Sequence, residues 1–522
     1  MTTSPPNTAP ISTTLTTIDD PRRRRLILIA VCVALMAVIA SVSGLNVAQP
    51  QVAVELGASQ SSVLWIINAY TLTLAALLLP LGAAGDRWGR KRTLLAGLAI
   101  FAVANILGAL APSTEVLLAA RVLSGVGAAV IMPITLAVIT STFPEEERAK
   151  GIGVWSAVGG GGGILGMFLS AVLVDLGSWR WLFVLPVALA AVAFAITLKS
   201  VPDSRDNSAH RFDVLGSVSS AVGIVGLITA LHEGPVHGWS APLTLVGLGA
   251  GVLGLAFFVV SQLRRSEPLL DLRMFRSRAL SSGSVALLAV FGVQGGILVV
   301  LFPYFQTVLG WSGLGATLGL MPMALLMMLS AALAPKLSTR VGIRPTMLTG
   351  IGVFAGGLVL LAGLASADGG YVGVLPGLLV MGAGMGIAMT PATEGITSAL
   401  PRAQQGVASA LNDVTRELGT ALGVALLGAV LSAGYRNAID PFVAGMQGAT
   451  ADAAREGVAN LTAAAGSGPD AEALIRAAQD AFVAGWQQAM WVGVVVMIAL
   501  FVFVAVSRPR GGRTEEAADV SA

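Results

Sequence analysis

Long apolar stretches follow one another along this chain from residue 26 to residue 506. Hydrophobic residues make up 55% of its 522 residues and charged residues 11%, whereas an ordinary soluble domain has about 25% charged residues. About 20 apolar residues suffice to cross a bilayer as a helix, and a lone strand in lipid would leave its backbone groups unpaired. The sequence therefore predicts an all-α membrane protein with fourteen transmembrane helices, at 26–49, 62–84, 93–112, 116–141, 151–174, 181–199, 214–233, 243–262, 280–303, 314–335, 345–365, 372–396, 407–431 and 486–506.

The residue content also limits the chemistry that the chain can perform. Its one cysteine, Cys32, has no partner for a disulfide within the chain, and three histidines without a Cys/His cluster leave little for a transition-metal site. The phosphate-binding pattern G-x-x-x-x-G-K-[ST] is absent, so the sequence predicts no ATPase. We expect no cofactor, no metal, no nucleic-acid partner and no enzymatic activity.

Basic residues gather in alternate loops. With fourteen spans, 25 of the 31 lysines and arginines fall on one side, among them Arg22–Arg25 and Arg508. By the positive-inside rule that side is cytoplasmic, so both termini of this multi-pass membrane protein are expected there. On the other side, residues 432–485 are expected to form a long outer loop with a short helix at 470–485.

Two loops share a sequence pattern. The loop between spans 2 and 3 reads Gly-Asp-Arg-Trp-Gly-Arg-Lys at 85–91. The loop between spans 10 and 11 reads Ser-Thr-Arg-Val-Gly-Ile-Arg at 338–344. This repeat predicts two parallel six-helix bundles, an architecture of transporters, with spans 7–8 as an inserted hairpin. The predicted domains are a disordered cytoplasmic N-terminus 1–25, an N-terminal six-helix bundle 26–200, the inserted hairpin with flanking loops 201–278, a C-terminal six-helix bundle 279–507 and a cytoplasmic tail 508–522.

Several motifs resemble those of the major facilitator superfamily. Residues 82–92, Gly-Ala-Ala-Gly-Asp-Arg-Trp-Gly-Arg-Lys-Arg, resemble its loop 2–3 signature, and Arg121-x-x-Ser124-Gly125-x-Gly127 resembles its span-4 motif. Residues 143–148, 178–181 and 412–419 resemble the fourteen-helix drug:proton antiporter branch of the EmrB/QacA type. The resemblance covers residues 26–507 and implies the major facilitator fold, small amphipathic substrates and coupling to protons.

Spans 1 and 5 depart from the pattern of this branch. Its members often carry an aspartate shortly before the Asn-Val-Ala-x-Pro stretch of span 1, and here Ser41 occupies that place. In span 5, Gly166-Met167 stands where the exporter motif has Gly-Pro. The proton-coupling role of the span-1 acid is therefore not carried over to this chain. The glycine run 159–163 in span 5 predicts close contact with another span, either sliding or fixed, and the resemblance implies that this partner is span 10.

The loop after span 2 holds the candidate latch for alternating access. The resemblance assigns this role to Gly82, Asp86, Arg87, Gly89, Arg90 and Lys91. Asp86 lies just before the start of span 3, where a carboxylate stabilises a helix N-terminus. For Arg90, Lys91 and Arg92 the alternative is simple anchoring of the positive side, including contact with anionic lipid.

Few ionisable residues remain inside the spans, and these are functional candidates because charge is costly in lipid. The candidates for proton coupling are Asp413, Glu394, Arg121, Arg416 and Glu417. Asp413, Arg416 and Glu417 share one helical side, so the arginine could keep one acid charged while the other carries a proton; a structural ion cluster is the alternative. Arg121 could bind an anionic substrate group or pair with an acid such as Glu394, and the resemblance favours proton transfer or a structural role.

By resemblance, spans 1, 4, 9 and 12 line the substrate pathway. Its candidates are polar or adaptable side chains there and nearby: Ser41, Asn46, Gln49, Asn68, Tyr70, Trp155, Gln294, Tyr304, Gln306 and Met385. Methionine adapts to varied ligands, although simple packing is its commoner use. His232 and Glu233 end span 7 and are expected to have an ordinary surface role at the outer interface.

Together with the resemblance, the sequence predicts a proton-driven secondary exporter of amphipathic drugs or toxic small molecules in a bacterial plasma membrane, which works by alternating access. Its expected partners are the small-molecule substrate, protons and membrane lipids. One alternative is export of an endogenous metabolite or lipid by the same fold. Another is a non-transporting membrane sensor or scaffold, although the predicted cytoplasmic parts are small for signalling.

Overall fold

The computed structural model describes residues 18–57, 60–203, 213–265, 268–444, 446, 449–464 and 469–507, and every regular element in them is helical. Fourteen of these helices are long and apolar enough to cross a membrane, and each contains one of the predicted spans or most of it. They are α1 (Pro21–Leu56), α2 (Gln60–Trp88), α3 (Arg90–Ala109), α4 (Thr114–Thr142), α5 (Glu145–Leu176), α6 (Trp181–Ser200), α7 (Val214–His237), α8 (Pro242–Arg264), α9 (Arg278–Pro303), α10 (Gly313–Val341), α11 (Ile343–Leu364), α12 (Gly370–Thr397), α13 (Gln405–Val443) and α16 (Pro469–Val506). The predicted all-α membrane fold is therefore confirmed.

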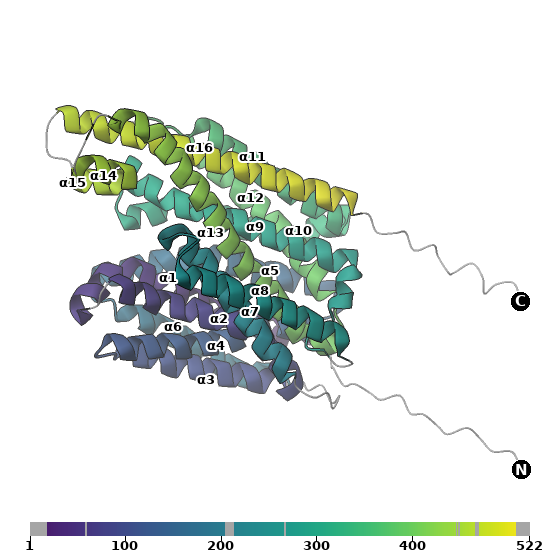
Figure 1. Cartoon of the computed structure of the whole chain (residues 1–522). Helices are drawn as coiled ribbons and strands as arrows, with labels where there is room; N and C mark the ends of the chain where they lie inside the picture. Colours follow the sequence, from purple (N-terminus) through teal and green to yellow (C-terminus); the bar gives the residue numbers. More distant parts are fainter. Residues whose placement is uncertain are drawn as a thin grey trace, which may run out of the picture.

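The helices form two six-helix bundles. Figure 1 shows α1–α6, in purple and blue, below the second bundle of α9–α13 and α16, in teal to yellow. Each bundle has a buried apolar core of its own, and the bundles meet where α5 packs against α10 and where α2 and α4 pack against α13. The helix α1 begins, and the helix α16 finishes, at the same end of the molecule. We call this the basic end.

The inserted hairpin, α7 and α8, lies against the seam between the two bundles, because α7 packs on both α2 and α13. Its two helices approach closely through glycines: a Cβ on Gly226 would lie 2.5 Å from the backbone nitrogen of Gly251. Small residues of this kind let helices associate in lipid, where no hydrophobic force drives them together. Asp213 caps α7 by accepting a hydrogen bond from the Gly216 amide at 2.8 Å, and it also binds Gln262 of α8 at 2.7 Å.

The expected long loop 432–485 is wrong. α13 continues to Val443, α16 already begins at Pro469, and the short helices α14 (Ala449–Glu456) and α15 (Val458–Ala464) lie between them. The predicted short helix 470–485 is the first part of α16. These extensions stay helical because they pack: a Cβ on Gly434 would lie 2.7 Å from the Cα of Gly485, and the Tyr435 hydroxyl donates to the Ala454 carbonyl at 2.5 Å.

The expected disorder of residues 1–25 is also wrong for its last part, since α1 begins at Pro21. Arg24 holds this start in place by donating to the Ile18 carbonyl at 2.8 Å and to Glu147 of α5 at 3.0 Å. Residues 1–17 and the predicted tail 508–522 lie outside the described residues. The domain boundaries at 200/201 and 278/279 stay predictions.

Close contact between α9 and α13 predicts a sharp difference between two glycines of α13. A Cβ on Gly423 would overlap the Gly292 carbonyl, whereas a Cβ on Gly428 meets nothing within 4 Å. We expect Gly423→Ala to destabilise the purified protein by about 1–3 kcal/mol through overpacking. Gly428→Ala should leave stability unchanged or raise it by up to about 1 kcal/mol. Thermal unfolding in detergent measures both, and equal effects of the two variants would contradict the predicted packing.

Candidate functional site

Asp86 lies near the end of α2 and binds the start of α13, which belongs to the other bundle. Its carboxylate accepts hydrogen bonds from the Gly406 amide at 2.8 and 2.9 Å and from the Val407 amide at 3.2 Å. The first amides of a helix have no partner within the helix, and a negative charge there is favourable. Asp86 therefore acts as an N-terminal cap supplied by one bundle to a helix of the other.

Arg90 completes this contact. Its guanidinium donates to Asp86 at 2.8 Å and to the Arg402 carbonyl, just before α13, at 2.9 Å. Both members of the ion pair are more than 90% buried. A buried charge without partners is costly, and here the hydrogen bonds that offset this cost come partly from the opposite bundle.

Glycines let the two backbones touch beside this ion pair. A Cβ on Gly82 would lie 2.5 Å from the Gly406 carbonyl oxygen and 2.7 Å from the Cβ of Ala410. Any larger side chain at Gly82 would push α2 away from α13, and Asp86 would then lose its amide partners. We call Gly82, Asp86, Arg90 and Gly406 the inter-bundle clamp.

The other predicted latch residues lie around the clamp rather than in it. Gly89 caps α3 with a φ of 96°, a conformation that glycine adopts without strain. Arg87 is exposed and Lys91 is half-buried. The repeat in the second bundle has the same turn, with Gly342 at a φ of 95°. There, however, the positions that match Asp86 and Arg90 hold Thr339 and Ile343, so the second loop has no matching ion pair.

Asp413 is fully buried in α13 and forms an ion pair with Arg416 at 3.7 Å. Its Oδ1 accepts a hydrogen bond from Asn412 at 3.2 Å, and Asn412 in turn accepts one from Thr393 of α12 at 3.0 Å. Within the described part of the chain, Oδ2 has no hydrogen-bond partner. The predicted ion cluster is present, with Glu417 half-buried one residue after Arg416.

Arg416 lies where the two bundles meet. Its guanidinium stands 4.4 Å from the ring centre of Phe291 in α9 and 5.7 Å from that of Trp155 in α5. Trp155 is fully buried and donates to the Thr135 hydroxyl of α4 at 3.0 Å. A change of charge at Asp413 would therefore be felt at a contact between the bundles.

Arg121 of α4 forms a second buried charge site inside the first bundle. It donates to the hydroxyl of Ser41 at 3.0 Å and to the Ser41 carbonyl at 3.2 Å, and its guanidinium lies 4.2 Å from the ring centre of Tyr70. No acidic side chain is among the contacts that the structure describes for it. The described contacts therefore do not include the proposed pairing of Arg121 with Glu394, and the basic group whose charge acts on Glu394 is Arg148 of α5.

The other predicted pathway residues do not gather at one place. Tyr304 is fully buried in the second bundle, where its hydroxyl donates to the Ser366 carbonyl at 3.0 Å, and Gln306 follows it in the π-helical turn η2 (Tyr304–Val308). Gln294 and Met385 are buried in α9 and α12. Asn46 and Gln49 belong to α1, but their side chains lie outside the described part.

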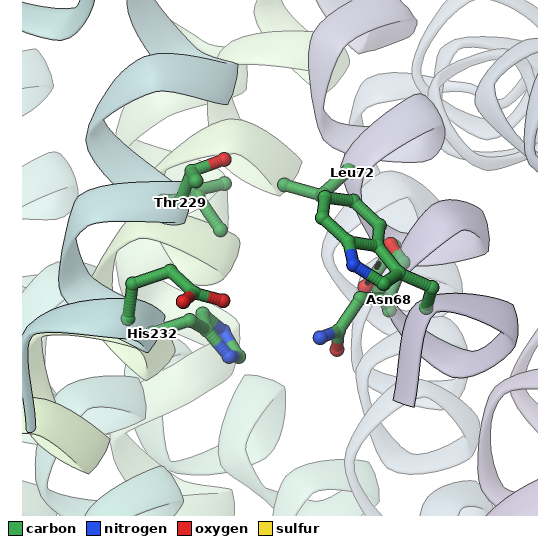
Figure 2. Close-up of a pocket in the computed structure, with 8 residues that line it drawn as sticks. Asn68, Leu72, Thr229 and His232 are labelled. Carbon is green, nitrogen blue, oxygen red and sulfur yellow. Dashed lines mark hydrogen bonds between the residues drawn. The ribbon is translucent and has the colours of Figure 1, made fainter. Parts of the chain in front are cut away.

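Asn68 faces the inserted hairpin. Figure 2 shows its amide across a small pocket from Thr229 and His232 of α7, with Leu72 of α2 beside it. The pocket volume of about 20 Å³ leaves room for about one water molecule. His232 is exposed, as predicted.

The glycine run of α5 contacts α10, as predicted. A Cβ on Gly160 would lie 3.1 Å from the Met327 side chain, and one on Gly161 would lie 3.3 Å from the Ala324 carbonyl. A Cβ on Gly153, six residues before the run, would lie 3.0 Å from the Ala331 carbonyl oxygen. The two bundles therefore touch through glycine on both of their main seams.

Comparisons with known proteins agree with this arrangement. The family model described as Major Facilitator Superfamily matches residues 30–424. The chain belongs to the major facilitator superfamily. Its relatives include the multidrug resistance protein Stp of Mycobacterium tuberculosis, 31% identical over 80% of this chain and 78% of that protein. The multidrug efflux pump LfrA of Mycolicibacterium smegmatis is 30% identical over 95% and 99%, and the methyl viologen resistance protein SmvA of Salmonella typhimurium is 31% identical over 88% and 93%.

Solved structures of this superfamily share the fold. The human organic anion transporter MFSD10 matches 93% of this chain and 100% of its own with a TM-score of 0.60 and 14% identity. The proton:xylose symporter XylE matches 92% and 96% with a TM-score of 0.55 and 15% identity. The predicted superfamily is thus confirmed, and the names of the sequence relatives agree with the predicted branch.

The motif at residues 178–181, which resembles one of the fourteen-helix branch, joins helices at the end opposite the basic end. The Trp179 indole donates to Glu55, which ends α1, at 2.5 Å, and Arg180 forms an ion pair with the same carboxylate. These two donors, Arg180 first, hold the pKa of the Glu55 carboxyl below its usual range. The motif fastens the loop between α5 and α6 to α1 within one bundle.

Sequence reasoning missed three participants. Asn105 of α3 accepts a hydrogen bond from the Ser41 hydroxyl at 3.3 Å and is fully buried; a lone amide in the apolar span 93–112 was its signal. Arg148 was recognised only as a basic residue of a loop and as the last residue of the motif 143–148, not as a group that acts on Glu394. The amides of Gly406 and Val407 carry no sequence signal, because any helix start offers such groups.

From the geometry of the inter-bundle clamp we predict that the negative charge of Asp86 controls the opening of the basic end. Asp86→Asn keeps one acceptor but removes the charge, and a hydrogen bond to a charged group contributes about 1.5–3 kcal/mol. We expect the population with a separated basic end to rise about tenfold. Double electron–electron resonance between labels at Arg92→Cys and Arg340→Cys, with Cys32→Ser, measures it.

Asp368→Asn is the matched control, because Asp368 is exposed at the opposite end, where it pairs with Arg476. It should leave the distances unchanged. Identical distance distributions for wild type and Asp86→Asn would show that the clamp charge does not hold the bundles together.

Proposed function

We propose that this major facilitator exports amphipathic drugs or toxic small molecules across a bacterial plasma membrane by alternating access, driven by inward proton flow. Members of this superfamily are membrane carriers of small molecules. Relatives named for multidrug resistance, multidrug efflux and methyl viologen resistance, matched over most of their length, support this substrate class. The proposed partners are the small-molecule substrate, protons and surrounding lipid.

The inter-bundle clamp is the observation that carries the proposal. Alternating access requires two bundles that separate at one end while they close at the other, and the closed end needs a contact that forms and breaks as a unit. The Asp86 carboxylate satisfies this requirement because its amide donors belong to the opposite bundle. When the bundles separate, Asp86 and the α13 amides become accessible to water, which can replace the lost hydrogen bonds.

Asp413 is the best candidate for the proton carrier. The charge of its neighbour Arg416 is constant, because arginine keeps its proton. Protonation of Asp413 would therefore change the net charge of the pair by one. Arg416 lies against Trp155 of one bundle and Phe291 of the other, which gives this change a route to the inter-bundle contact. Glu394, on which the charge of Arg148 of the opposite bundle acts, is the second candidate, and Glu417 the third.

Arg121 is proposed to organise the first bundle rather than to bind a proton donor directly. Its guanidinium ties Ser41 of α1 and Ile66 of α2 to α4. Ser41 stands at the place of the span-1 acid in related proteins, and an arginine that binds a serine there keeps its charge without a carboxylate. This arrangement favours α13, rather than α1, as the helix that carries the proton.

The basic end is proposed to face the cytoplasm. Single cysteines in a Cys32→Ser background test this, because Thr339 is exposed in the last turn of α10 at the basic end and Ser240 is exposed between α7 and α8 at the other end. In intact cells we expect Ser240→Cys to react with an impermeant maleimide and Thr339→Cys to be protected until the cells are opened. The reverse pattern would contradict the orientation.

Proton coupling is tested in proteoliposomes with a fluorescent lipophilic cation as the transported probe. Wild-type protein should accumulate the probe in the acidic compartment against its gradient. We expect Asp413→Asn to abolish this uphill transport while probe binding stays within about twofold, because the aspartate holds the proton rather than the substrate. Asp440→Asn, an exposed acid on the same helix, is the control and should transport normally.

Glu394→Gln and Glu417→Gln are measured in the same assay to separate the three candidate acids. Full pH-driven accumulation by all three single variants would contradict proton coupling through these residues. Absence of accumulation by the wild-type protein for a panel of lipophilic cations and neutral compounds would contradict the proposed substrate class.

A further inference from the structure

A cavity of about 730 Å³ opens at the basic end of the second bundle, and neither the clamp residues nor Asp413 line it. Four helix ends surround it: α9 and α11 begin there, and α12 and α16 end there. Three arginines line it, Arg276, Arg278 and Arg344, together with several serines. The proposed transport mechanism makes no use of this cavity.

The cavity is strongly positive. No aspartate or glutamate is among the described residues that line it. The starts of α9 and α11 add the positive ends of two long helices, whose first amides lack partners within the helix. Such a concentration of positive charge at helix starts favours an anion, and a phosphate group matches the hydrogen-bonding geometry of arginine.

The three arginines are held differently. Arg344 donates from Nε to the Val504 carbonyl at 3.0 Å and from a second nitrogen to the Ala505 carbonyl, so it is fixed against the end of α16. Arg276 and Arg278 are exposed, and the described residues offer neither of them an ion pair. The cavity therefore combines one fixed cation with two that are free to close on a ligand.

The remaining wall is apolar, which decides what kind of anion fits. Ile343, Met347 and Val504 line the same cavity, and Ile343 is 43% exposed. A free phosphate ion would leave most of the volume unfilled, since cavities of 300–1,000 Å³ accommodate whole organic ligands. The ends of four membrane-spanning helices also lie at the depth where lipid head groups begin.

We propose that this cavity binds one anionic phospholipid, with its phosphate between Arg276, Arg278 and Arg344 and its upper acyl chains along Ile343, Met347 and Val504. Basic pockets between transmembrane helices suit such head groups, and each basic residue near the membrane surface contributes to their attraction. The site joins α9, α11, α12 and α16, so the bound lipid fastens helix ends within the second bundle.

The test compares two double variants of the full-length protein that lose the same charge at the same end. Arg276→Gln/Arg278→Gln removes the two mobile cations of the cavity and leaves Arg344 on α16. Arg264→Gln/Arg340→Gln removes two exposed arginines that do not line it. Thermal unfolding in detergent verifies that both variants are folded, and each single Gln variant is measured as well.

Native mass spectrometry of the purified protein, titrated with phosphatidylglycerol or with phosphatidylcholine of the same acyl chains, gives the readout. We expect one tightly bound phosphatidylglycerol on wild type, with a preference of about tenfold over phosphatidylcholine. The cavity variant should lose this preference, the single variants should lose part of it, and the matched control should keep it.

Three results would overturn the proposal. The first is an unchanged preference in the cavity variant, and the second is an equal loss in the control variant, which would reduce the effect to net charge. The third is competition by inorganic phosphate at concentrations as low as those of the lipid, which would show an anion site without a role for the acyl chains.

Discussion

The carboxylate of Asp86 closes the basic end because its backbone amide donors, at Gly406 and Val407, belong to the other bundle. The amides of Gly406 and Val407 are unpaired by the geometry of any helix start, and the negative charge of Asp86 is stabilised by the same dipole that they create. The interaction needs backbone contact between Gly82 and Gly406, and Arg90 completes it. Every other contact between the bundles, including the glycine seam of α5 and α10, has to be compatible with making and breaking this one.

The two buried arginines of the membrane interior illustrate two ways to keep a charge in a medium of low polarity. Arg121 is surrounded by a serine, carbonyl oxygens and the ring of Tyr70, all within one bundle. Arg416 instead pairs with Asp413 and lies between aromatic rings of both bundles. Of these two arrangements, only the second contains an acid whose protonation would alter the net charge of the pair. Only the second also lies at the contact between the two bundles. This difference is the physical reason to place proton coupling in α13.

The internal repeat is preserved in backbone shape but not in charge. Gly89 and Gly342 adopt nearly the same positive φ and begin the third helix of each bundle. The ion pair occurs only in the first loop, whereas Arg344 of the second loop turns to the end of α16 and to the basic cavity. Thus the same turn serves the contact between the bundles in the first loop and, in our proposal, the contact with lipid in the second.

Much of the fold and part of the site could be predicted from the sequence. The fourteen apolar stretches required helices, because lipid offers no hydrogen-bond partner to an open backbone, and the scarcity of charges inside them singled out Arg121, Asp413 and Arg416. The range 432–485 was misread as a loop because its polar residues, such as Arg436 and Asp480, hide the packing of Gly434 against Gly485. A polar sequence indicates that a segment lies outside the apolar part of the bilayer. It does not exclude a helix that continues beyond the lipid, as these two helices do.

Partners across the molecule were decided only by the tertiary structure. Sequence spacing relates residues three or four apart on one helix, as for Asp413 and Arg416, but it carries no information on which of two distant helices will meet. Asp86 and Gly406 are 320 positions apart, and the donor at Gly406 is a backbone group common to every residue but proline. The sequence by itself therefore determined the helices and the charges that had to be compensated. The packing of two bundles decided which group compensates each of them, because that choice depends on distances that only the folded chain creates.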